Sequence, residues 1–78
     1  MMGVNEYIQV GHNTKYARLA KGISQKDMAA MLNLPISTYA NYEADRREMS
    51  AELIAQASKA LNVPLLDLLS PTIIFRIE

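Results

Sequence analysis

The sequence has no cysteine, a single histidine and only three glycines, and these scarcities exclude most kinds of catalytic, metal-binding and phosphate-binding site. Without cysteine the chain forms neither disulfides nor thiolate metal sites, and a reducing cytoplasm is the expected compartment. His12 stands alone, the carboxylates do not occur at metal-ligand spacing, and there is no glycine-rich phosphate loop. Because neither a Ser-His nor a Cys-His pair is available, we expect a protein that is not an enzyme and needs no cofactor.

Long hydrophobic runs are missing as well. The longest uncharged run, residues 28–42, is too short and too rich in Asn, Ser and Pro to cross a bilayer. The first residues lack the basic and then apolar pattern of a signal peptide. We therefore expect a soluble cytoplasmic protein with no membrane partner.

The chain also has no excess of charge of either sign. Eight basic and eight acidic side chains cancel, so the net charge gives no support for nucleic-acid binding. The local distribution gives some support, because residues 11–26 carry basic but no acidic side chains, and Arg46 is followed by Arg47. An ordinary solvated helix face would show the same pattern, so charge alone does not decide between the two interpretations.

What the chain does contain is typical of one small helical domain. Half of the residues are hydrophobic but only 6% are aromatic, so Ala, Leu, Ile and Met must supply most of the core. Apolar periodicity predicts five helices, over residues 12–21, 25–32, 36–44, 51–61 and 64–69. Ser24 and Ser50 are the expected N-caps of the second and fourth helices, and Tyr16 and Leu19 are apolar positions of the first.

A short sequence recurs at two of the predicted helix junctions. The tetrapeptide LNLP at residues 32–35 is echoed by LNVP at residues 61–64. In both copies Asn favours the left-handed conformation that ends a helix, and Pro favours the start of the next one. The first copy predicts a corner of about three residues, as in a helix-turn-helix motif. After the second copy, the leucines at positions 65, 66, 68 and 69 are expected to be buried almost completely.

The two ends of the chain show the alternation of β-strands. Residues 72–78 are β-branched and apolar on nearly both faces, and residues 4–10 alternate apolar with polar side chains. A free edge of this kind invites aggregation, so we expect a small sheet. Pairing of the tails between two protomers would provide it, and folding of the tail onto its own domain is the alternative. The dimerisation residues are then Ile73, Ile74, Phe75 and Ile77.

The order and spacing of these elements resemble the helix-turn-helix family of Cro and the lambdoid phage repressors, also known as the XRE family. The matching elements are Arg18, GISQ at 22–25, Met28-Ala29, NLP at 33–35, YEAD at 42–45, ALNV at 60–63 and Leu68-Leu69. The resemblance covers residues 11–70, between an N-terminal arm of residues 1–10 and a tail of residues 71–78. It implies an all-α, five-helix domain like that of lambda repressor, in which the second and third helices form the helix-turn-helix.

The resemblance also implies which residues meet DNA, since in this family the third helix enters the major groove. The implied base contacts are Ile36, Ser37, Ala40 and Asn41, and Gln25 matches the family's phosphate-binding Gln. Because of their charge, we expect additional phosphate contacts from Lys26, Arg46 and Arg47. The amide of Asn41 has the donor and acceptor that pair with adenine N6 and N7. Arg18 and Glu43 match a partly buried ion pair that joins the first helix to the end of the recognition helix. For each exposed position, an ordinary solvated side chain is the alternative.

The implied function is sequence-specific regulation of transcription. The simplest form is a repressor of phage, prophage or bacterial origin that binds a palindromic operator in double-stranded DNA as a homodimer. Two alternatives remain open, namely an antitoxin that also represses its own operon, with a toxin as its partner, and a protein-interaction module that keeps the fold without binding DNA. Two departures from the family pattern stand out: Tyr39 replaces a β-branched core residue and needs a partner for its hydroxyl, and Asp45 stands where the family usually has Gly.

Overall fold

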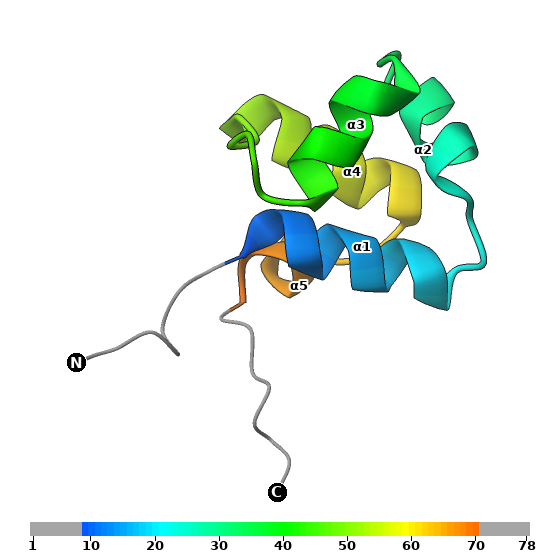
Figure 1. Cartoon of the computed structure of the whole chain (residues 1–78). Coiled ribbons are helices and arrows are strands. Elements are labelled where there is room, and N and C mark those ends of the chain that lie inside the picture. Colours follow the sequence, from blue (N-terminus) through cyan, green and yellow to red (C-terminus); the bar gives the residue numbers. More distant parts are fainter. Residues whose placement is uncertain (1–8, 71–78) are drawn as a thin grey trace, which may run out of the picture.

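The structure, a computed structural model, describes residues 9–70 and consists there of five helices joined by short turns (Figure 1). The helices are α1 (Val10–Ala20), α2 (Gln25–Met31), α3 (Ile36–Glu43), α4 (Ala51–Leu61) and α5 (Leu65–Leu69). No strand occurs among residues 9–70, so the predicted all-α fold is confirmed. The predicted tail strand and its dimerisation residues lie outside the described residues, as does most of the predicted N-terminal strand. Val10, the last residue of that segment, is the first residue of α1.

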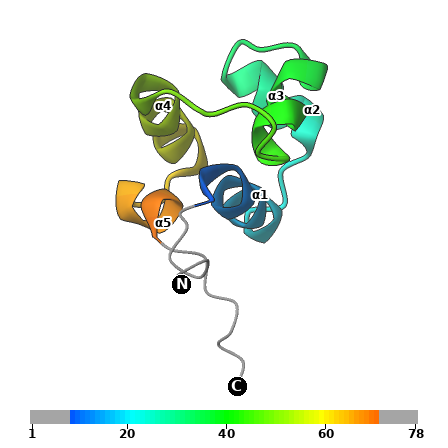
Figure 2. The ribbon, with the colours of Figure 1, turned by 60° about the vertical axis from the view of Figure 1, so that its left-hand side comes forward.

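The helices pack around α1, which contacts α3, α4 and α5, while α2 packs against α3. Figure 2 shows α1 beside α5 at the base of the domain, with the α2–α3 pair above it and α4 on the other side. The core fills the space between these helices. Its fully or nearly fully buried apolar side chains are Met28, Ala29, Leu32, Tyr39, Met49, Ala57, Leu61 and Leu68.

The buried face of α1 is made of small and polar residues, not of its large apolar ones. Gly11, Thr14 and Arg18 are buried, whereas Tyr16 and Leu19 are 58% and 52% exposed. The buried Thr14 hydroxyl has a hydrogen-bond partner within the helix, because it donates to the carbonyl of residue 10 at 2.7 Å. Of the apolar or small positions noted in the sequence of this helix, Ala17 packs against the core, whereas Tyr16 and Leu19 do not. The contact of α1 with α3 depends on close approach and on charge.

One type of turn ends four of the helices. A residue with positive φ follows each of α1 to α4, and these residues are Gly22 (71°), Asn33 (58°), Asp45 (59°) and Asn62 (56°). In every case the N–H of the next residue donates to the carbonyl five positions before it, which defines a Schellman motif. Asn and Asp tolerate this left-handed conformation better than other side chains do. The two predicted Asn stops are thus confirmed, and Asp45 is a third stop of the same kind.

The predicted helix starts also have their caps, whereas the last helix is less buried than expected. The hydroxyls of Ser24 and Ser50 accept hydrogen bonds from the backbone three residues on, at 3.0 and 3.1 Å. In α5, Leu68 is completely buried, but Leu65 and Leu66 are 43% and 73% exposed. The expected burial of all four leucines is therefore wrong. The short helix α5 turns one side toward the core, and the leucines on its other side face outward.

Candidate nucleic-acid interface

The outward face of α3 is short and uncharged. Tyr39 is fully buried and Tyr42 is half-buried on the inner side, while Ile36 and Ser37 are exposed at the start of the helix. Ala40 and Asn41 are half-buried and follow one turn later on the same side, since residues four apart share a helix face. The structure thus brings the four residues expected to contact bases to one side of α3.

A buried carboxylate holds this helix in place from the inside. Glu43 Oε2 accepts from Arg18 Nε at 2.6 Å, and Glu43 Oε1 accepts from Arg18 Nη2 at 3.2 Å and from Gln25 Nε2 at 3.0 Å. The hydroxyl of Tyr39 also donates to Oε2. Arg18 makes one more bond, from Nη1 to the Ile23 carbonyl at 2.7 Å. We refer to Arg18, Gln25, Tyr39 and Glu43 as the carboxylate hub, and it joins α1, α2 and α3.

The charges of the hub are fixed by its hydrogen bonds. Burial alone would raise the pKa of Glu43, but hydrogen bonds from Arg18, Gln25 and Tyr39 outweigh it and hold that pKa below its usual value. The hydrogen bond with Glu43 raises the pKa of Arg18. Burial, together with the hydrogen bond to Glu43, raises the pKa of Tyr39. At neutral pH the hub therefore contains an ionised pair and a neutral phenol.

Asp45 ties the end of α3 to the start of α1, a role that the sequence did not reveal. Its Oδ1 accepts from the Gly11 N–H at 3.1 Å and its Oδ2 accepts from the His12 N–H at 3.2 Å. The residue before the helix, Gln9, makes no side-chain cap of its own, so Asp45 caps α1 from 34 positions away. Gly11 permits the start of α1 to approach the end of α3 closely, because a Cβ at this position would overlap the carbonyl oxygen of Tyr42.

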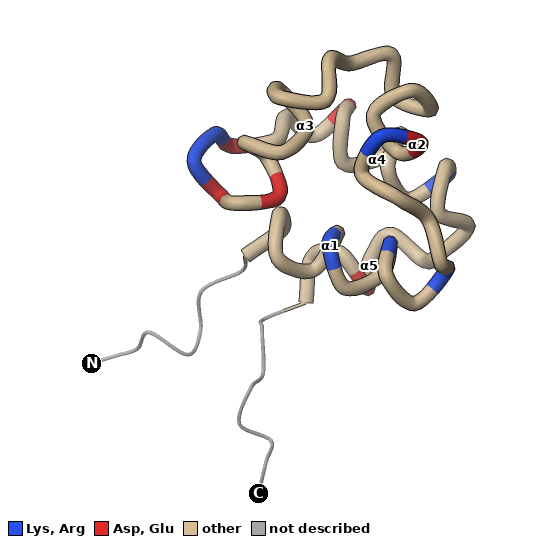
Figure 3. The backbone as a smooth tube through the Cα atoms, turned by 45° about the vertical axis from the view of Figure 1, so that its right-hand side comes forward, with Lys and Arg blue, Asp and Glu red and all other residues tan. Residues whose placement is uncertain are grey.

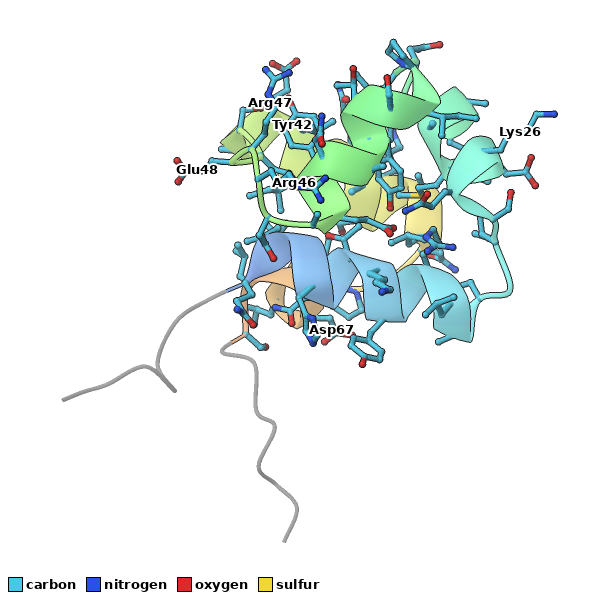
Figure 4. All side chains as sticks on the ribbon, viewed as in Figure 1. Lys26, Tyr42, Arg46, Arg47, Glu48 and Asp67 are labelled. Carbon is cyan, nitrogen blue, oxygen red and sulfur yellow. The ribbon has the colours of Figure 1, made fainter. Side chains whose placement is uncertain are left out.

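The cations expected at phosphates lie at opposite ends of the α2–α3 pair. Figure 4 shows Lys26 at one end, and Arg46 and Arg47 at the other, beside the C-terminal part of α3. Arg46 Nη1 donates to Asn41 Oδ1 at 3.2 Å, and the guanidinium of Arg47 lies 5.3 Å from the centre of the Tyr42 ring. In Figure 3 the two arginines appear as a blue segment bordered by acidic residues on both sides.

Gln25, also expected at a phosphate, is instead partly engaged in the carboxylate hub. One N–H of its amide donates to Glu43, and an amide nitrogen carries two hydrogens, so a second donor remains. The structure places this side chain where it can orient α2 against α3. Any phosphate contact must use the second N–H.

Neither a metal site nor a membrane span is found in the part of the chain that the structure describes. Within residues 9–70, no three carboxylate or imidazole side chains are grouped so that they could hold a metal ion. None of the helices there has both the length and the apolar character needed to cross a bilayer.

Comparison with known proteins identifies the same arrangement elsewhere. A sequence profile described as Helix-turn-helix matches residues 15–68, which is more than half of the chain. Among solved structures, the restriction-modification controller protein C.AhdI from Aeromonas hydrophila is 28% identical, with a TM-score of 0.71, and the match covers 78% of this chain and 92% of that one. The clp gene regulator ClgR from C. glutamicum is 25% identical, with a TM-score of 0.75 and coverages of 88% and 87%.

A third solved structure extends this set. The hypothetical transcription factor NHTF from Neisseria is 25% identical, with a TM-score of 0.75, and the match covers 86% of this chain and 75% of that one. Among curated proteins, none matches the chain significantly. The similarity to solved structures therefore extends over most of the length of each protein compared.

Proposed function

The chain belongs to the helix-turn-helix family, and from this premise we propose that it is a sequence-specific DNA-binding regulator of transcription that acts as a dimer on a palindromic operator. In the complex, α3 lies in the major groove and α2 lies across the phosphate backbone. The observation that carries this proposal is the outward face of α3, where uncharged side chains of modest size lie between Arg46 and Arg47 at the C-terminal end of the helix and Lys26 at the far end of the α2–α3 pair.

The side chains divide into those that specify and those that position. Asn41 and Ser37 reach base edges through hydrogen bonds, and Ile36 and Ala40 offer apolar contact to thymine methyl groups. Contacts to phosphates supply affinity without reading the base sequence. We assign them to Lys26, Arg46, Arg47 and the second amide N–H of Gln25. The zero net charge does not oppose this assignment, because three of the eight basic residues lie at the two ends of the α2–α3 pair.

We propose that the protein represses transcription. A small domain bound in the major groove can block a promoter without an additional activating domain. The names of the similar structures support regulation in general: one is a controller protein of a restriction-modification system and another regulates the clp gene. Within residues 9–70, no observation favours the antitoxin alternative or a catalytic role.

Selection of binding sites from random duplex DNA tests the proposal. We expect enrichment of a palindrome, and we expect Asn41→Ala to relax the preference at one position of each half-site by about tenfold, because one bidentate or paired base contact is worth about 1–3 kcal/mol. Gln56→Ala, an exposed change on α4, is the control and should leave both affinity and preference unchanged. Absence of any enriched sequence at low salt would contradict DNA recognition and favour the interaction module.

Removal of residues 72–78 tests the proposed dimer. The alternating Ile73, Phe75 and Ile77 favour pairing of tails between protomers, as argued from the sequence, so we expect the truncated protein to be a folded monomer in solution. Binding to the full palindrome should weaken strongly, while the circular dichroism spectrum stays helical. Mass measured by light scattering decides the question, and a truncated protein that still dimerises would contradict exchange of the tails.

A further inference from the structure

The turn after α3 fastens Arg46 to Asn41 by two hydrogen bonds. The backbone N–H of Arg46 donates to the carbonyl of Asn41 at 3.0 Å, as the Schellman motif requires. The side chain adds a second bond, from Nη1 to Asn41 Oδ1 at 3.2 Å. Figure 4 shows Arg46 lying along the C-terminal part of α3. The guanidinium and the amide are therefore parts of one local unit.

This unit is anchored to the body of the domain. Asp45, the residue directly before Arg46, has the positive φ that turns the chain back, and its N–H donates to the Tyr42 carbonyl at 3.0 Å. Its carboxylate accepts hydrogen bonds from the N–H groups of Gly11 and His12 in the first turn of α1. The backbone of Arg46 is consequently held by α1 and α3 together, so its side chain starts from a fixed point next to Asn41.

The bond from Arg46 determines which atoms Asn41 presents to DNA. A guanidinium has only donors, so the amide atom that faces it must be the oxygen, and the two N–H groups are left to face elsewhere. Arg46 keeps its other N–H donors as well. A donor that approached the same oxygen, such as the N6 amino group of adenine, would meet the positive guanidinium there. The pair as a whole therefore offers donors and a positive charge.

We propose that Asn41 and Arg46 together select guanine at one position of the operator, an inference that rests on the proposed function. In the major groove guanine presents two acceptors, N7 and O6, whereas adenine presents one acceptor and one donor. The second lone pair of Oδ1 lies beside this guanidinium, so the free groups of the pair are mainly donors and match the two acceptors of guanine better than the acceptor and donor of adenine. This differs from the pairing with adenine expected for an isolated Asn. The difference arises from Arg46, which positions Asn41 in addition to making the phosphate contact proposed above.

The test is site selection from random duplex DNA with the full-length protein and three variants of it. The wild type should enrich a palindrome with guanine at the position that Asn41→Ala relaxes. Arg46→Ala should reduce the preference for guanine over adenine there by about tenfold while the other positions keep their preferences. Arg47→Ala is the matched control, because it removes an equal charge from the next residue; it should lower affinity for all sequences alike.

A modified base sharpens the experiment. Replacing the guanine by 7-deazaguanine removes one acceptor, and we expect it to weaken wild-type binding about tenfold but to change the binding of Arg46→Ala by less than twofold. Enrichment of adenine at the Asn41 position, or a guanine preference that survives Arg46→Ala, would overturn the inference and leave the proposed function standing. Failure to enrich any sequence would overturn both.

Discussion

Replacing Glu43 by Gln should lower the free energy of unfolding by about 3–5 kcal/mol, because removal of one partner leaves the other charge of a buried ion pair without compensation. Gln has nearly the shape of Glu, so the change creates almost no cavity. It leaves Arg18 charged, buried and facing a neutral amide. A domain of this size has a total stability of about 5–15 kcal/mol, so much of it would be lost.

Urea unfolding followed by circular dichroism measures this effect, and Glu48→Gln is the matched control. Glu48 is an exposed acid in the loop after α3, so its replacement makes the same change in net charge without disturbing the core. We expect its effect to stay within about 0.5 kcal/mol. If the two variants were equally stable, the carboxylate hub would contribute nothing to the fold.

The same variant should change how stability depends on pH. The pKa of Glu43 is lower in the folded chain than in the unfolded chain, so its contribution is fully present above the ordinary carboxyl pKa of about 4.3. It is lost as the pH falls through the lower, folded value. We expect the wild type to lose stability between about pH 4 and the onset of acid unfolding, and Glu43→Gln to lose less over that range.

Gly11→Ala should also destabilise the domain, by about 2–4 kcal/mol. The added Cβ would overlap the Tyr42 carbonyl oxygen and lie 2.8 Å from Asp45 Oδ1, and a backbone atom cannot move aside as a flexible side chain can. Relief requires the start of α1 to separate from the end of α3. Overpacking of this kind costs about 1–3 kcal/mol, and loss of the Asp45 cap adds about 1 kcal/mol.

Gly22→Ala provides the comparison for this variant. Gly22 has a φ of 71°, but a Cβ there would have no neighbouring atom within 4 Å, so only the left-handed conformation is penalised, at about 1–2 kcal/mol. We therefore expect the melting temperature of Gly11→Ala to be the lower of the two. The reverse order would mean that α1 and α3 do not approach each other at Gly11.

The parts of the fold that could be predicted are those encoded by neighbouring residues. The Ser24 and Ser50 caps, together with the Asn33 and Asn62 stops, depend on interactions within about five positions, so the sequence pattern contains them. The burial of α1 could not be predicted in this way. Its inner face is set by contacts with α3 more than 20 residues away, and those contacts select small and polar side chains.

The candidate site shows the same division. The outward positions of α3 follow from helical periodicity, and the hydroxyl partner that Tyr39 was expected to need is Glu43, one helical turn away. The cap that Asp45 provides and the contact of Arg46 with Asn41 were not predicted. Both depend on the left-handed conformation at residue 45, for which Asp is an uncommon choice compared with Gly or Asn.

The carboxylate hub and the outward face of α3 consist of different residues, and this separation affects how the sequence of such a protein can evolve. Glu43 and Tyr39 hold the helix from inside, so we expect a substitution at the exposed Ser37 to alter the proposed target sequence with little effect on folding. Asn41 is different, because its partner Arg46 belongs to the following turn. We therefore expect that retargeting at that position, by evolution or by engineering, needs both residues to be exchanged as one unit.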